Sequence, residues 1–63
     1  MQVYILQQRI YTNNEFIAVY DSLAKATATP TYQGVVAIEH GKDCLIIETK
    51  MGNTFVIHST EVL

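Results

Sequence analysis

The segment CLIIETKMGNTFVIH, residues 44–58, carries the strongest strand signal in this sequence. It holds two apolar runs rich in β-branched and aromatic residues, which pack well on a pleated surface. Between the runs, Gly52 can adopt the positive φ that a tight reversal requires, and Asn53 tolerates that conformation better than most residues. The segment therefore predicts a β-hairpin.

The face assignment of this hairpin is the same for either position of a two-residue turn. A two-residue turn at Met51-Gly52 or at Gly52-Asn53 gives the same parity of cross-strand pairing. With that parity, one face collects Leu45, Ile47, Val56 and His58. The other face collects Cys44, Ile46, Phe55 and Ile57. Because Cys44 and His58 then point to opposite faces, we expect no Cys-His nucleophilic pair.

A third strand is predicted directly before the hairpin, at residues 35–39. Residues 40–43 form a four-residue connection that contains a glycine, so Glu39 is expected to pair with Cys44. This pairing adds Val36 and Ile38 to the first face, and Val35 and Ala37 to the second. Both faces are then apolar, which is typical of strands covered on both sides.

The first half of the chain predicts a second hairpin and a helix. Residues 3–11 and 16–20 read as strands joined by an Asn-rich reversal, and this hairpin is long enough to project beyond the sheet. Asp21 and Ser22 are good helix N-caps for residues 23–28, and Pro30 is expected to end that helix. The length of this connection also permits a right-handed β-α-β unit between the second and third strands.

These elements give an α+β fold in a single domain, residues 1–63. It is mainly an antiparallel sheet of about five strands with one short helix, in the order β-β-α-β-β-β. One helix of two turns cannot cover both faces of such a sheet. Either the sheet curls into a small barrel, or another chain covers the remaining apolar face.

Stability arguments also favour association. A chain of 63 residues buries only about 60% of its unfolded surface and usually needs a disulfide, a metal or a partner. Its single cysteine cannot form an internal disulfide, and one cysteine with two histidines gives no zinc-site spacing. We therefore expect a homo-oligomer or a hetero-complex, without metal or cofactor. The expected oligomer interface consists of Val35, Ile46, Phe55 and Ile57.

Charge and hydropathy narrow the function classes. The formal net charge is −2 and the four basic residues are scattered, so nucleic acid is not the expected partner. No apolar run approaches the roughly 20 residues that span a bilayer, and the N-terminal residues lack signal-peptide features. We expect a cytoplasmic protein that does not interact with membranes.

The sequence contains no catalytic signature, so we expect no enzyme. Tyrosine, arginine and asparagine are frequent at protein interfaces, and the first half of the chain is rich in tyrosine and asparagine. The expected partner-binding residues are Tyr4, Arg9, Tyr11, Asn13, Asn14, Phe16 and Tyr32. The predicted function is a protein-binding module, such as a phage-type inhibitor or an accessory subunit, whose partner is another protein chain.

An alternative comes from the second half of the chain. Apolar runs and turns alternate there in a rhythm that resembles the strands of SH3-like and Sm-like barrels. The runs are residues 34–38, 44–49, 52–57 and 61–63. The resemblance covers about half of the chain and implies a small barrel that binds nucleic acid.

Overall fold

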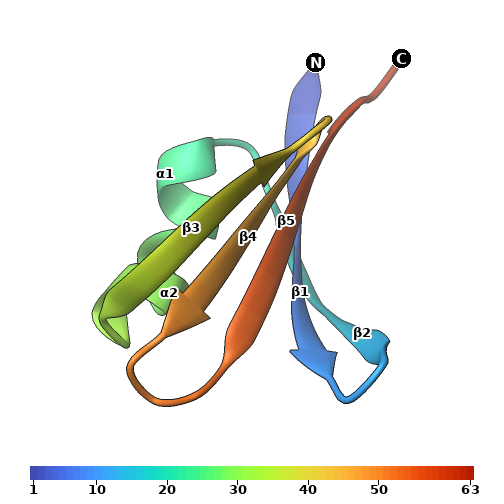
Figure 1. Ribbon diagram of the computed structural model, residues 1–63. Coiled ribbons are helices and arrows are strands. Elements are labelled where there is room, and N and C mark those ends of the chain that lie inside the picture. The colour runs from blue at the N-terminus through green and yellow to red at the C-terminus, as the bar shows by residue number, and fades with distance from the viewer.

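The computed structural model describes all 63 residues as one antiparallel sheet with two short helices on one side (Figure 1). The strand order across the sheet is β2-β1-β5-β4-β3. The elements are β1 (Gln2–Ile10), β2 (Asn13–Tyr20), α1 (Leu23–Ala26), α2 (Ala28–Tyr32), β3 (Val35–Gly41), β4 (Cys44–Thr49) and β5 (Thr54–Glu61). The predicted five-stranded, mainly antiparallel sheet is confirmed, but the helical segment is divided in two.

The helices begin and continue for local reasons. Ser22 caps α1, because its Oγ accepts a hydrogen bond from the Lys25 backbone N–H at 3.2 Å. The prediction that Pro30 ends the helical segment was wrong, since Pro30 is the third residue of α2. The N–H groups of the first helical turn have no partner within the helix, so proline is tolerated there.

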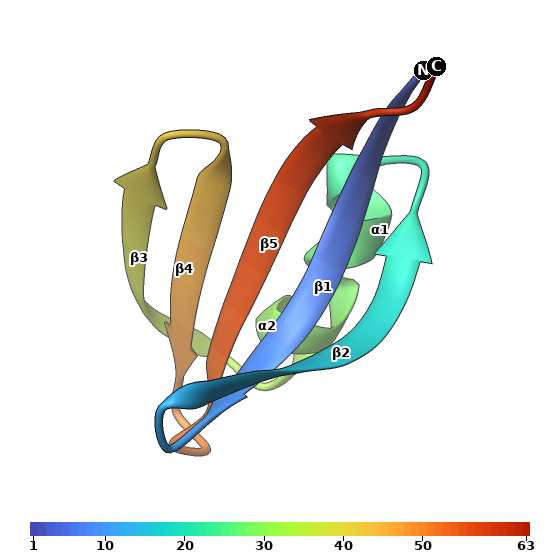
Figure 2. The same cartoon turned by 90° about the vertical axis from the view of Figure 1, so that its right-hand side faces the viewer.

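The helical segment carries the chain from one edge of the sheet to the other. β2 and β3 lie at opposite edges, so they do not form the β-α-β unit that the length of the connection permits. Figure 2 shows α1 and α2 behind β1 and β5, with the sheet curling around them. Each edge strand has a single neighbour, and the sheet is therefore open rather than closed into a barrel.

The β4–β5 turn differs from expectation by one residue. The Thr49 N–H donates to the Asn53 carbonyl at 2.9 Å, which leaves a three-residue loop with Gly52 at φ 83°. Leu45 therefore pairs with Ile57, and Ile47 with Phe55. Since strand side chains alternate between faces, this single step reverses every face predicted for β5 relative to β4.

The β3–β4 turn is shorter than expected, with Gly41 paired to Cys44 across two residues. This register is shifted by two residues from the predicted pairing of Glu39 with Cys44. An even shift preserves the faces. Ile38 therefore lies on the same face as Leu45 and Ile47, as predicted, but it pairs with Ile47 instead of Leu45.

The core lies between the sheet and the helices. Leu6, Ile47, Phe55 and Ile57 extend from the covered face of the sheet, and each is at most 2% exposed. Ala26 of α1 and Pro30 of α2 are buried against this side. Both short helices thus contribute small side chains that allow close approach to the strands.

A polar cluster closes the core beneath the β4–β5 loop. The buried Thr49 hydroxyl donates to Gln33 Oε1 at 3.1 Å, and Asn53 Nδ2 donates to the same oxygen at 2.8 Å. Gln8 Nε2 completes the chain of bonds by donating to Asn53 Oδ1 at 3.1 Å. These bonds join the end of α2 to β1, β4 and the loop.

Candidate functional site

The β1–β2 turn places a tyrosine where the backbone favours glycine. Tyr11 and Thr12 form a two-residue loop between the paired residues Ile10 and Asn13, and Tyr11 has φ 57°. A left-handed conformation costs a residue with a Cβ atom roughly 1–2 kcal/mol. The Tyr11 side chain is 95% exposed, so no packing offsets that cost. The turn thus displays an aromatic ring that the fold does not require.

Three more polar or aromatic side chains lie directly behind this turn, on the uncovered face of the sheet. Arg9 is paired with Asn14, and its Nε donates to Asn14 Oδ1 at 3.3 Å. Two residues along the hairpin, Phe16 is paired with Gln7 and is 64% exposed. We call Arg9, Tyr11, Asn14 and Phe16 the hairpin surface.

A β-bulge in β2 shapes this surface. Leu6 pairs with Ala18, whereas the next residue, Gln7, pairs with Phe16, so Ile17 is the extra residue of β2. A bulge bends its strand and turns side chains away from their regular directions. Phe16 and Ile17 are both exposed as a result.

The hairpin does not project beyond the sheet as far as expected. β1 pairs with β5 from Gln2 to Arg9, so only the Ile10–Asn13 pair and the turn extend past the last paired residue of β5, Thr54. The flanking β5 strand pairs with β1 as far as Arg9. Arg9, Asn14 and Phe16 are therefore carried by paired strands rather than by a free loop.

The structure brings together only some of the predicted partner-binding residues. Asn13 is close in sequence but alternates to the other side of the hairpin. Tyr4 lies on the covered face, in the row of Leu6 and opposite Tyr20. Tyr32, which is 92% exposed, ends α2 near β3, at the other edge of the sheet.

The expected oligomer interface does not form one surface. Phe55 and Ile57 are buried under the helices, and Ile46 lies on the opposite face of the sheet from them. Val35 is half-buried at the start of β3. The one-residue difference in the β4–β5 loop is the physical reason, since it places Phe55 and Ile57 among the core residues of β4.

The same difference makes Cys44 and His58 neighbours. They are directly paired on the uncovered face, which corrects the expectation that they point to opposite faces. No side-chain hydrogen bond joins them. A cysteine nucleophile is activated by a hydrogen-bonded base, and this pair lacks that contact.

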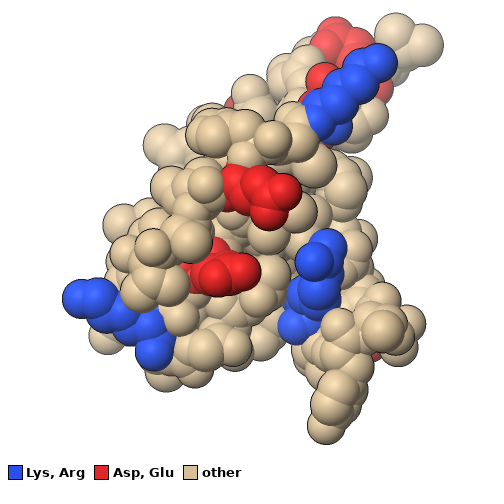
Figure 3. Space-filling model, in the orientation of Figure 1, with Lys and Arg blue, Asp and Glu red and all other residues tan.

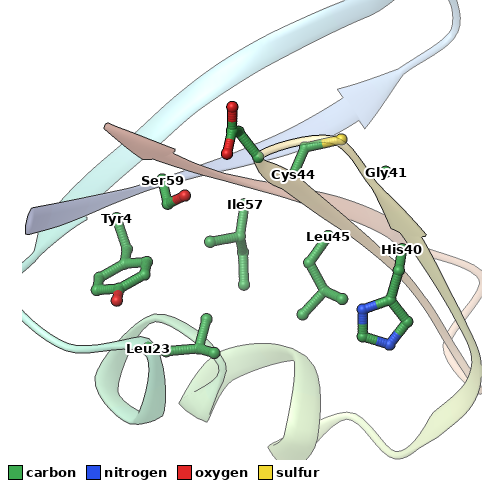
Figure 4. A pocket seen from close by; sticks show the side chains of 9 residues that line it. Tyr4, Leu23, His40, Gly41, Cys44, Leu45, Ile57 and Ser59 are labelled. Atoms are coloured by element: carbon green, nitrogen blue, oxygen red, sulfur yellow. The ribbon is translucent and has the colours of Figure 1, made fainter. Parts of the chain in front are cut away.

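A hollow of about 230 Å³ opens between α1 and the end of the sheet near the β3–β4 turn. In Figure 4 the side chains of Tyr4, Ile57 and Leu45 point toward Leu23 of α1, while the Cys44 thiol points away from them. The floor is therefore apolar. The polar residues that line the hollow are His40, Asp43 and Ser59.

Charge does not concentrate on the side of the molecule where β3, β4 and β5 face the viewer. Figure 3 shows the basic side chains of that side separated from one another by neutral and acidic surface. No group of three or more His, Cys, Asp or Glu side chains is arranged to hold a metal ion. No helix has the length and hydropathy needed to cross a membrane.

Comparison with family models, with curated proteins and with solved structures finds no match to this chain.

Proposed function

We propose that this chain is a non-enzymatic protein-binding module that contacts a partner protein through the hairpin surface. The exposed Tyr11 ring at a left-handed position carries the proposal. Its conformation opposes folding and its side chain adds no packing, so a role in binding accounts for the residue better than a role in stability. An inhibitor or an accessory subunit would act in this way.

The chemistry of the surface supports this proposal. Aromatic and arginine side chains supply much of the binding energy at protein interfaces, because they bury a large area for few rotatable bonds. Phe16 and Tyr11 provide two such rings on either side of the Arg9–Asn14 hydrogen bond. That bond orients the Arg9 side chain before a partner arrives, which lowers the entropy lost on binding.

A comparison of four forms of the chain tests the proposal. The tagged wild-type chain, Tyr11→Gly, Phe16→Thr and Tyr32→Ala are used to capture proteins from an extract of the organism that encodes the chain. We expect a stoichiometric partner with the wild type and with Tyr32→Ala, and at least about a tenfold loss of affinity with either hairpin variant. Tyr32→Ala is the matched control, because it removes an equally exposed tyrosine at the opposite edge.

Two results contradict the proposal. One is a partner that binds Tyr11→Gly and Phe16→Thr as tightly as the wild type. The other is an equal loss of binding in Tyr32→Ala, which would mean that the hairpin surface has no special role. Binding to single-stranded nucleic acid that weakens steeply with added salt would instead favour the nucleic-acid alternative.

A further inference from the structure

The free edge of β3 is exposed along almost its whole length. Six of its seven residues are exposed, and Val36 and Ile38 are 58% and 51% exposed. Natural proteins protect such edges with lysine, proline or bulges. Residues 35–41 contain no lysine or proline, and the register irregularity of β3 lies at its start, before Ala37.

The other edge strand, β2, is protected. Its bulge falls in the middle of the strand, between the residues paired with Leu6 and Gln7. Figure 2 shows β2 bending sharply along its length. A straight strand from another chain could therefore pair with β3 over a regular stretch, residues 37–41, but not over a comparable stretch of β2.

Hydrogen bonds in the neighbouring strands show which β3 groups are free. The Thr49 N–H donates to Asn53 and the Asp43 carbonyl accepts from Ser59, so odd-numbered residues of β4 bond toward β5. The Lys50 N–H instead donates to Gly34, on the β3 side. Even-numbered residues of β4 thus bond toward β3.

The β3–β4 register then assigns the free groups of β3. Glu39 pairs with Ile46 and Gly41 with Cys44, so these odd-numbered β3 residues bond inward. Ile38 and His40 therefore direct their backbone N–H and C=O groups outward, to the free edge. A strand that pairs there bonds with Ile38, and also with His40 where the pairing extends that far.

We propose that the chain forms a homodimer in which β3 pairs antiparallel with β3 of a second copy, with Ile38 opposite Ile38. A two-fold axis perpendicular to the sheet requires residues of the same face to lie opposite each other. Ile38 satisfies this condition with itself, and its outward N–H and C=O groups exchange two hydrogen bonds with their equivalents. The exposed Ile38 side chains become neighbours across the junction.

Charge repulsion favours the register with Ile38 opposite Ile38 over the neighbouring register with Glu39 opposite Glu39. A shift by two residues would centre the pairing on Glu39 and place two carboxylates directly opposite each other, which is unfavourable. With Ile38 at the centre, each Glu39 lies opposite Ala37 of the second copy. The regular pairing then spans residues 37–39 of each copy, and His40 faces Val36 beside the irregularity at the start of β3. A second copy of this chain supplies what this edge lacks, because it carries the same unpaired backbone groups and the same exposed apolar residue at position 38.

The dimer is compatible with the proposed function but does not depend on it. β2 lies at the sheet edge opposite β3, so both hairpin surfaces remain free at the two ends of a continuous sheet of paired copies. Failure of partner binding would leave the dimer in place, and a monomer could still bind a partner. The two proposals can therefore fail separately.

The first test is the mass of the full chain in solution by sedimentation equilibrium. We expect twice the chain mass of 7.1 kDa for the wild type, and the single-chain mass for Ile38→Pro. Proline removes the outward N–H of Ile38 but none of the bonds to β4, and edge strands tolerate it on that side. Ile38→Thr keeps the N–H and a β-branched side chain, so it should still dimerise.

The second test does not require the proline variant to fold. In a Cys44→Ser background, Ile38→Cys places two thiols at opposite positions, with Cα atoms about 5.5 Å apart. That distance suits a disulfide. The two copies of Ala37→Cys would be about 8 Å apart, beyond disulfide reach. We expect Ile38→Cys to cross-link at least about ten times faster than Ala37→Cys under mild oxidation.

Three results overturn the proposal. They are a wild-type chain that stays monomeric at millimolar concentration, a folded Ile38→Pro variant that is still dimeric, and equal cross-linking rates for the two cysteine variants. A dimer mass together with selective cross-linking at position 38 supports it.

Discussion

At the residue scale, a substitution of Tyr11 is expected to change partner binding without lowering the free energy of unfolding. Its φ of 57° suits glycine, and its ring is solvated. Tyr11→Gly relieves backbone strain but increases the entropy of the unfolded chain, and the two effects nearly cancel. We expect the free energy of unfolding in urea to stay the same or to rise by up to about 1 kcal/mol, while partner binding is lost. A fall of more than about 1 kcal/mol would show that the ring is structural.

Thr49 is a second residue whose role is visible only in the structure. It is 4% exposed, and its hydroxyl donates to Gln33 Oε1 and accepts from the Asn53 N–H. Thr49→Val keeps the shape but removes both hydrogen bonds, so the Asn53 N–H loses its acceptor while Gln33 Oε1 keeps only the bond from Asn53 Nδ2. We expect a loss of about 1–3 kcal/mol of stability, measured by urea unfolding. Thr60→Val at an exposed position should have almost no effect, and equal losses in the two variants would refute the role of the cluster.

At the element scale, the β4–β5 loop determines which isoleucine of β4 is in the core. Ile47 is 2% exposed under the helices, whereas its neighbour Ile46 is half-buried on the uncovered face. Ile47→Ala should lower the free energy of unfolding by about 2–5 kcal/mol because it leaves a cavity. Ile46→Ala should cost clearly less, since its site stays open to solvent. Thermal and urea unfolding of the two variants compare them directly, and the reverse order would contradict the observed register.

At the scale of the whole molecule, the strand order connects the proposed β3–β3 dimer with the proposed partner binding through the hairpin surface. A dimer joined at β3 carries its two hairpin surfaces at the far ends of the sheet. Two sites on one particle bind a dense surface more tightly than one site, because the second contact is intramolecular.

We therefore expect the wild-type chain to dissociate from a densely immobilised partner at least about ten times more slowly than Ile38→Pro. In solution, each hairpin surface should show the same affinity for the soluble partner in both forms. Surface plasmon resonance at high and low partner density measures this difference. Equal dissociation rates at both densities would show that the two surfaces cannot bind together.

Local chemistry determined much of this fold. β-branched runs specify the strands, Gly52 marks the β4–β5 turn, and Ser22 starts the helical segment as predicted. The Asn-rich reversal was placed too late in the chain, because the turn is Tyr11-Thr12 and Asn13 and Asn14 both lie in β2. Tyr11, Asn14 and Phe16 could be named from their residue types, because aromatic and amide side chains at a turn are typical of interfaces.

Only the tertiary structure decided the faces, the edges and the neighbours. One residue in the β4–β5 loop moved Phe55 and Ile57 from a predicted interface into the core and brought Cys44 beside His58. The pairing of β1 with β5, which leaves β3 and β2 as edges, joins residues far apart in the chain. Short-range preferences carry no information about such distant contacts. They also cannot distinguish a loop of two residues from a loop of three. Because side chains alternate between the two faces of a strand, that difference of one residue moves every side chain of the following strand to the other face.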